Sequence, residues 1–324
     1  MTAKKFFDKL STKRFSVVFA VALIILFFYG CAPEEKVELK PVTNQVSAYK
    51  VVDLFRKDYL FDQPSSNKET VKNTELDTEI VYDQVTRDID AEGNIIDDVT
   101  IKSIKYLNTD SEGVNINYDS SVNAQPGSAF TMLIGQTYTI KMTPDYTVLE
   151  ISNIEPVRQA IKDGKDNRFA VGLVSDENIR RRHEILAMPD KNKKTLKVGD
   201  SWSRVVASPK GSLIPKNYEK IYTVEKITDG VALIKMNATP TSKRLENQPQ
   251  ESEAMEMFKN FFDSEDNYNG QLMINIETGI VYEYNESLNS KYTAAEFPRG
   301  EPKPEKPDVL NLSFTESHSI ELLD

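Results

Sequence analysis

The chain has 324 residues, with 40 basic and 50 acidic side chains, a formal net charge of −10 and a single cysteine. An acidic surface repels phosphate backbones, which argues against nucleic acid as a partner. One cysteine can form no disulfide within the chain and no multi-cysteine zinc or iron–sulfur site, so a hydrophobic core must stabilise the fold. With 39% hydrophobic and 28% charged residues, the composition is that of a globular domain.

Residues 1–30 have the pattern of an export signal. Five basic residues precede an apolar run of 14 residues from 15 to 28, which is shorter than the ~20 residues of a membrane-spanning helix. Tyr29-Gly30-Cys31 then resembles a bacterial lipobox, in which the cysteine is lipidated and becomes the new N-terminus. The resemblance implies lipid attachment at Cys31; the alternative is an uncleaved anchor. Without residues 1–30, the chain has 294 residues and a net charge of −14.

Residues 31–47 are polar and contain two prolines, so we expect a flexible tether between the membrane and the domain. Ala32 is not the aspartate that retains some lipoproteins at the inner membrane, which favours the outer membrane, facing either the periplasm or the surface. Glu34 and Glu35 resemble a surface-export signal of some lipoproteins, although a solvated linker has the same composition. The expected membrane contact therefore depends on the acyl chains of Cys31.

The domain at 48–324 is rich in short β-branched and aromatic runs separated by turn residues, which is typical of antiparallel sheet. We expect strands at 49–61, 80–82, 99–107, 114–118, 203–207 and 308–323, and a polar loop at 62–77. Three hairpins are predicted at 135–152, 218–237 and 270–285, with turns at Pro144-Asp145, Asp229-Gly230 and Thr278-Gly279.

Three helices are predicted. One covers 156–163 and another 176–187, where the run Arg180 to Arg182 is interpreted as a solvated face, with an anion site as the alternative. The third, at 251–262, has one apolar side with spacing of three and four residues, formed by Met255, Phe258, Phe261 and Phe262. These four side chains either fill the concave face of the sheet or form the lid of an apolar pocket.

Two segments resemble each other, which predicts an internal repeat. Apolar positions from Ile101 to Ile116 match those from Ile221 to Leu233, and each segment is followed by Gly-Gln, at 135 and at 270. We therefore expect an α+β fold, a curved, half-barrel-like and mainly antiparallel sheet from two related halves, 48–165 and 195–290, with a returning C-terminal strand. The alternative is that hairpins of this kind are alike without being repeats.

The lipobox, Lys-Val-Gly-Asp-Ser-Trp at 197–202, the hairpin at 229–231 and Glu-Thr-Gly at 277–279 resemble a family of uncharacterised bacterial lipoproteins. The motifs are structural, so the resemblance implies no catalytic residues. The layout is also similar to the half-barrel of the periplasmic lipoprotein carriers, in architecture only. Trp202 is expected to pack in the core, with Asp200 fixing the turn before it.

No motif indicates catalysis or a cofactor. The two histidines, His183 and His318, are far apart in sequence, and no nucleophile elbow, phosphate loop or zinc-binding helix motif occurs. Two turns have oxygen ligands at alternate positions, as calcium loops do, and the candidate ligands are Asp88, Asp90, Glu92, Asp110, Glu112 and Asp119. The same residue types are what a turn between strands needs, so we expect no metal at either.

We therefore expect a non-catalytic envelope lipoprotein that binds an apolar ligand or a partner protein. One alternative is a structural or assembly subunit of an envelope complex, and another is a hydrolase without a recognisable motif. A ligand-binding function requires a pocket of a few hundred cubic ångströms, whereas an assembly function requires an exposed apolar patch.

Overall fold

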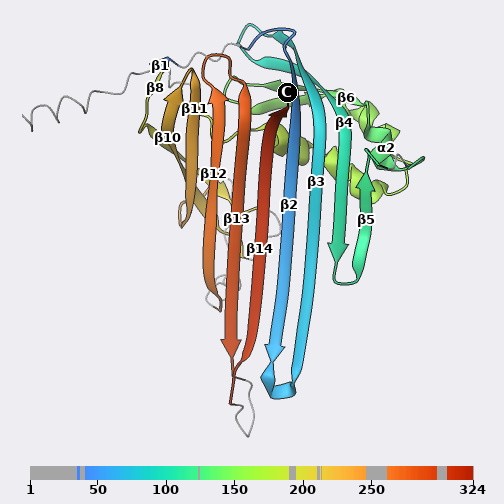
Figure 1. Cartoon of the computed structure of the whole chain (residues 1–324), viewed down its shortest axis with the longest axis vertical. Coiled ribbons are helices and arrows are strands. Elements are labelled where there is room, and N and C mark those ends of the chain that lie inside the picture. The colour runs from blue at the N-terminus through green and yellow to red at the C-terminus, as the bar shows by residue number, and fades with distance from the viewer. Residues whose placement is uncertain are drawn as a thin grey trace, which may run out of the picture. The chain divides into compact units, whose positions relative to one another are not determined.

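The computed structural model describes residues 35–36, 41–122, 125–189, 195–209, 212, 214–245, 261–297 and 305–323. Within these residues, twelve strands form one sheet in the order β7-β6-β4-β3-β2-β14-β13-β12-β11-β10-β9, with β5 paired to β4. All the pairs in this sheet are antiparallel. The sheet is open and curved, which confirms the predicted α+β fold with a curved antiparallel sheet (Figure 1).

The strands of the first half of the chain are β1 (Glu35–Lys36), β2 (Val46–Gln63), β3 (Lys68–Ile89), β4 (Ile95–Asp110), β5 (Gly113–Asp119), β6 (Thr137–Met142) and β7 (Val148–Ser152). Those of the second half are β8 (Thr195–Leu196), β9 (Ser201–Ala207), β10 (Asn217–Thr228), β11 (Val231–Thr241), β12 (Asp263–Asn275), β13 (Val281–Glu296) and β14 (Asp308–Leu323). The C-terminal strand β14 lies between β13 and β2, so the last strand and the first long strand are neighbours.

Short helices lie on one side of the sheet, behind its upper half in Figure 1, and the long strands β2, β3, β13 and β14 continue below them. These helices are α2 (Ala129–Leu133), α3 (Ile154–Ala160), α4 (Asn167–Leu173) and α5 (Asp176–His183), while the short η1 (Pro64–Ser66) forms the connection between β2 and β3 at their lower ends. No helix in the described part of the chain is long and apolar enough to span a membrane.

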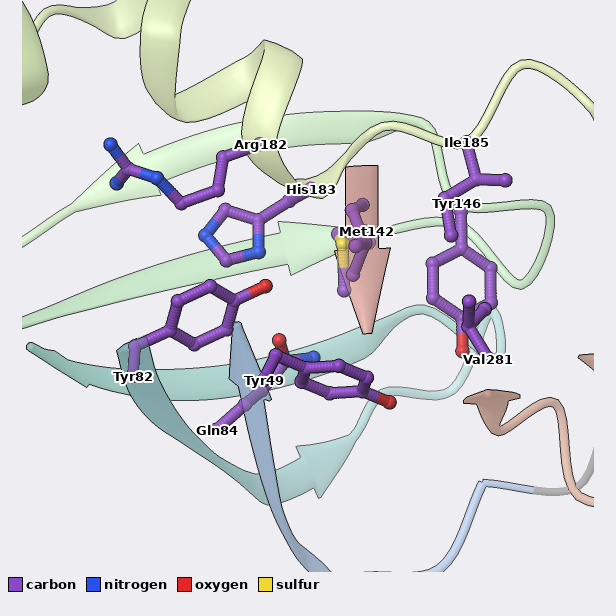
Figure 2. Close-up of a pocket in the computed structure, with 10 residues that line it drawn as sticks. Tyr49, Tyr82, Gln84, Met142, Tyr146, Arg182, His183, Ile185 and Val281 are labelled. Atoms are coloured by element: carbon purple, nitrogen blue, oxygen red, sulfur yellow. The ribbon is translucent and has the colours of Figure 1, made fainter. Parts of the chain in front are cut away.

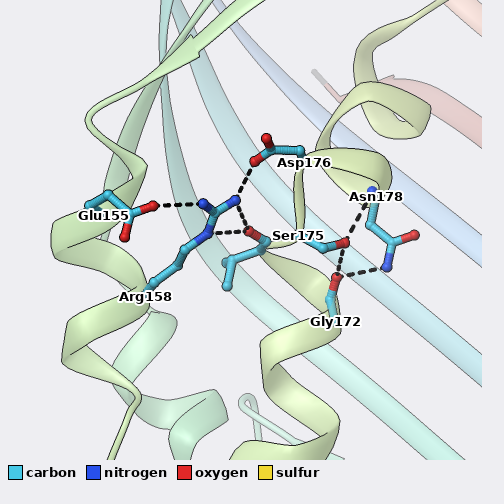
Figure 3. Close-up of polar contacts among 7 residues, drawn as sticks. Glu155, Arg158, Gly172, Ser175, Asp176 and Asn178 are labelled. Carbon is cyan, nitrogen blue, oxygen red and sulfur yellow. Dashed lines mark hydrogen bonds and ion pairs between the residues drawn. The ribbon is translucent and has the colours of Figure 1, made fainter.

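Helix α5 begins where its sequence predicts. The side-chain oxygen of Ser175 accepts a hydrogen bond from the backbone N–H of Asn178, and Asp176 and Glu177 occupy the first turn, where carboxylates favour the helix dipole. Arg158 of α3 then fixes the helix in place. Its guanidinium donates to the carbonyl of Val174 and pairs with Glu155 and Asp176 (Figure 3).

One core unites the sheet and the helices. Side chains along each strand point alternately to the two faces of the sheet, and the buried strand positions include Tyr82, Tyr138 and Tyr222. Phe130 of α2 belongs to the same core. Trp202 packs against this core, with its ring 5.9 Å from that of Tyr222, and Asp200 accepts a hydrogen bond from the backbone of Lys197. Both expectations for this turn are confirmed.

The expected loop at 62–77 is wrong, because β3 already begins at Lys68 and pairs with β2 from Lys68 to Val85. The first residues of β3, up to Thr74, are exposed, so this part of the strand has no apolar alternation to reveal it. The sheet also begins inside the predicted tether, since the backbone N–H of Asn44 donates to the carbonyl of Thr86. In both segments, hydrogen bonds between backbone groups place the chain in the sheet without a pattern of apolar side chains.

The helix predictions are partly wrong in number and length. The helix expected at 176–187 ends at His183, and α2 and α4, which have five and seven residues, were not predicted. Helices this short carry too few periodic positions to be recognised. The helix predicted at 251–262 lies outside the described residues except for its last two positions.

The two segments of the proposed repeat both form hairpins with a bulge, β4 with β5 and β10 with β11. The Gly-Gln pairs after these hairpins have different places in the fold. Gly135-Gln136 precedes β6, which pairs with β4, whereas Gly270-Gln271 lies inside β12, which pairs with β11. The two-fold repeat stays a prediction.

Candidate functional site: a polar band in a cavity

Five polar residues interrupt the apolar alternation of the inner face of the sheet. We call them the polar band: Asp53, Lys220, Glu286, Glu316 and His318. On β14, the inward positions are apolar at Leu312 and Phe314 and again at Ile320, but Glu316 and His318 stand between them. A polar residue in a buried register position is more informative than an exposed apolar one, because burying it costs free energy.

The strand registers bring the polar band together. One row across the sheet holds Asp53 of β2, His318 of β14, Glu286 of β13 and Gly270 of β12. The next row holds Glu316, Leu288, Tyr268, Ala238 and Lys220. A side chain at 270 would overlap with the backbone carbonyl of Asn285, so the glycine permits the close approach of the two strands beside Glu286.

Charged groups from opposite elements pair within the band. Arg181 of α5 lies 3.1 Å from Asp53 and also forms an ion pair with Glu316. The Nδ1 of His318 lies 2.8 Å from the Asp53 carboxylate. Lys220 pairs with Glu286, which also accepts hydrogen bonds from Tyr268 and Tyr284. The Arg181 side chain is 39% exposed, because it projects into open space between the helix and the sheet.

These contacts shift the pKa values of the buried carboxyl groups in opposite directions. Burial acts to raise the pKa of Asp53, but the hydrogen bond from His318 and the charge of Arg181 outweigh it and hold that pKa below its usual value. Burial raises the pKa of Glu316, and the Arg181 ion pair only partly offsets this. The Glu286 pKa is lowered because Lys220 outweighs the effect of burial. In the polar band, nearby charges therefore offset the effect of burial fully at Asp53 and Glu286 but only partly at Glu316.

Two cavities meet at this band. The larger has a volume of about 860 Å³ and is lined by Arg181, Lys220, Glu286, Glu316 and His318, together with apolar side chains such as Leu186, Val206 and Leu288. The smaller, about 380 Å³, has mostly apolar and aromatic walls, including Phe55, Leu76, Phe169 and Leu173. Arg181, Asn178 and Glu316 line both cavities, so they form the boundary between them.

A third void beneath α5, of about 20 Å³, is lined mostly by side chains of the core (Figure 2). His183 lies over the ring of Tyr82 there, at 5.1 Å between ring centres, and its Nε2 lies 2.9 Å from the hydroxyl of Tyr138. Arg182 donates to the same hydroxyl and to the carbonyl of Leu173. This volume has room for little more than a water molecule.

The residues singled out from the sequence lie elsewhere. Phe261 is exposed, and Phe262 packs against Tyr292 in a small cluster apart from the main core, so neither lines the two cavities. Met255, Phe258 and Cys31 lie outside the described residues. The interpretation of Arg180 to Arg182 as a solvated face is wrong for Arg182, whereas the side chains of Arg180 and Arg181 are 40% and 39% exposed. Arg182 is 3% exposed and Arg181 reaches the polar band, because successive helical residues point about 100° apart and cannot all face solvent.

In the acidic turns, aspartate side chains accept hydrogen bonds from backbone N–H groups. Asp90 accepts hydrogen bonds from the N–H groups of Glu92 and Asn94 and pairs with Lys141, and Asp110 and Asp119 cap their own turns in the same way. Asp88 accepts from the backbone of Ile89, and Glu112 donates its N–H to Asp110. In the part of the chain that the structure describes, no three His, Cys, Asp or Glu side chains come together as a metal site.

Residues 92–281 match the model of a family described as "Family of unknown function (DUF6263)". The match covers more than half of the chain, so the chain belongs to this family. The matched range contains Arg181 and Lys220 of the site but not Asp53, Glu286, Glu316 or His318. No match is found among the curated proteins.

Three solved structures are similar at low scores. A lipovitellin structure described by its lipid–protein interactions is 9% identical, with a TM-score of 0.43, over 89% of this chain and 26% of that one. DynF from the dynemicin biosynthesis pathway of Micromonospora chersina is 8% identical, with a TM-score of 0.17, over 90% and 87% of the two chains. Pseudomonas aeruginosa OpdQ is 7% identical, with a TM-score of 0.18, over 86% and 100%. This chain thus spans about a quarter of the lipovitellin chain, and no TM-score reaches 0.5, so none of the three informs its function.

Proposed function

We propose that the chain is a non-catalytic binding protein that takes an amphipathic small molecule into the two cavities between α5 and the sheet. The large cavity carries the proposal. Its volume of about 860 Å³ lies within the range of small-molecule sites, and its walls combine apolar surface with a few convergent polar groups. The small cavity, at about 380 Å³, extends the site on the other side of Arg181.

The polar band changes the ligand class that the sequence predicts. A purely apolar molecule would leave Glu316 and His318 facing hydrocarbon, which costs free energy for each unpaired polar group. An amphipathic molecule places its polar end at the band and its apolar part along Leu186, Val206 and Leu288. The site therefore favours a ligand with one polar and one apolar end.

The geometry supports binding more than hydrolysis. Asp53 and His318 form the carboxylate–imidazole half of a catalytic triad. Among the described residues, however, no hydroxyl or thiol forms a hydrogen bond with Nε2 of His318, and a triad needs a nucleophile there.

Attachment to the outer membrane through a lipidated Cys31 is part of the same proposal, and its support is the sequence pattern of residues 1–31. Cys31→Ser should abolish palmitate labelling and leave unprocessed precursor. Unchanged labelling would contradict this part of the proposal and leave the cavity untouched.

The cavity is tested with Ala207→Trp, which places an indole at the wall of the large cavity. We expect the full chain carrying Cys31→Ser to bind the neutral amphipathic dye N-phenyl-1-naphthylamine with saturation. Ala207→Trp should weaken this binding about tenfold, a loss of about 1.4 kcal/mol. The control is Ala295→Trp, the same change at an exposed position near the end of β13, away from both cavities. Absence of saturable binding, or equal effects of the two variants, would contradict the proposal.

A further inference from the structure

Two residues that line the large cavity each carry a buried atom without a hydrogen-bond partner among the described residues: Oε2 of Glu316 and Nε2 of His318. Each residue is only 8% exposed. Buried polar atoms in folded proteins almost always have a partner, because leaving one unpaired costs about 1–3 kcal/mol. Two such atoms at one cavity point to a ligand group that pairs with both.

The chemistry of the two atoms defines that group. An ionised carboxylate only accepts hydrogen bonds, so Oε2 of Glu316 is an acceptor. The Nδ1 of His318 faces the Asp53 carboxylate and donates its proton there, and Nε2 accepts a hydrogen bond when the ring carries that one proton alone. The two residues are two positions apart on the same face of β14, about 7 Å along the strand. A group with several donors can reach both.

The charges around the cavity favour a cation over an anion. Its lining has five acidic residues and three basic ones, in the order Asp176, Glu177, Glu184, Glu286, Glu316 and then Arg180, Arg181, Lys220. Each basic group already has an acidic partner: Arg180 pairs with Glu184, Arg181 with Asp53 and Glu316, and Lys220 with Glu286. A ligand carboxylate or phosphate would compete with these acids, whereas an ammonium group adds to an acidic field.

Building on the proposed function, we infer that the ligand is an amphipathic amine. Its ammonium group donates hydrogen bonds to Oε2 of Glu316 and Nε2 of His318, and its hydrocarbon part lies along Val206 and Leu288. The ammonium group supplies three donors and no acceptor, which matches two acceptors that lack partners.

The test compares three probes of equal chain length, decylamine, 1-decanol and decanoate, against the full chain carrying Cys31→Ser. Binding is measured by calorimetry and by displacement of N-phenyl-1-naphthylamine. We expect decylamine to bind about tenfold tighter than decanoate or more, a difference of about 1.4 kcal/mol, with decanol between them. Decanoate binding as tightly as decylamine would overturn the inference.

Glu316→Gln sharpens the test, because it keeps the size of the side chain and removes its charge. It should abolish the preference for decylamine. The control, Glu321→Gln, is the same change on the same strand, at an exposed residue paired with Lys50 on the opposite face, and it should preserve the preference. The ranking of probes in the chain with Glu316 intact decides the inference even if Glu316→Gln does not fold. If none of the probes or the dye binds, the proposed function fails; if all bind without preference for the amine, only the inference fails.

Discussion

The chain has two histidines, and they lie in regions with opposite properties. Around His183, under α5, the imidazole and its neighbour Arg182 have protein partners and the remaining space is about 20 Å³. Around His318, on β14, a charged band borders cavities of about 860 and 380 Å³, and the Nε2 atom of the ring lacks a partner among the described residues. Both side chains are buried, so burial alone does not distinguish a structural histidine from a binding one.

The difference follows from neighbouring residues on one helix. Arg182 lies beside the small void and donates to Tyr138 and Leu173, while Arg181 lines the two cavities and pairs with Asp53 and Glu316. One supports the core, and the other forms the boundary between two open spaces. Helix α5 therefore contributes Arg182 to the stability of the core and Arg181 to the candidate site.

The largest effect on stability should come from replacing Arg182, and replacing Arg181 should have a smaller one. Arg182→Met leaves the Leu173 carbonyl without its donor and removes one partner of the Tyr138 hydroxyl, so we expect it to lower the free energy of unfolding by about 2–4 kcal/mol. Arg181→Met should cost about 1–2 kcal/mol, because its ion pair with Asp53 is partly exposed, whereas the Glu316 carboxylate that loses its partner is buried. Urea unfolding of both variants checks this, and equal losses would mean that the two regions do not differ as described.

A smaller effect should appear in the pH dependence of stability. Burial lowers the pKa of His183 well below its usual 6.5. Between the folded and unfolded pKa values the unfolded chain binds one more proton, so the contribution of His183 to stability is present above pH 6.5 and is lost as the pH falls, with a limiting slope of about 1.4 kcal/mol per pH unit.

The comparison protein for this effect is His183→Gln, which cannot bind that proton. The stability advantage of the unmodified chain over the variant should shrink by about 1 kcal/mol between pH 6.5 and 5.5, because the unfolded histidine is already half protonated at the start of this range. Titrations of other groups cancel in this difference. An advantage that is constant over this range would show that His183 is not held neutral by the core.

Much of the sheet can be predicted from single strands. The hairpins at 135–152, 218–237 and 270–285 and the C-terminal strand are present because local alternation and turn residues define them. The first part of β3 could not be predicted, because both of its faces are exposed. Its pairing with β2 uses backbone hydrogen bonds and does not require any particular residue type. The five-residue helix α2 is too short to show a period.

The candidate site was harder to predict, although one signal was present. On β14 the inward positions run Leu310, Leu312, Phe314, then Glu316 and His318, then Ile320, so the two polar residues interrupt an apolar series. Their partners are Asp53 on β2 and Arg181 on α5, which lie far away in the sequence. Polar residues on different strands become neighbours only through the pairing registers of those strands. The sequence of a single strand does not contain these registers.

The most direct test of the account uses the two histidines as reporters. The ring proton signals of His183 and His318, assigned with single substitutions, are followed by nuclear magnetic resonance while decylamine is added to the full chain carrying Cys31→Ser. We expect the His318 signal to shift with saturation and the His183 signal to stay in place, because only His318 borders the large cavity. A His318 signal that does not move, or equal shifts of both signals, would contradict the claim that the polar band is a binding site.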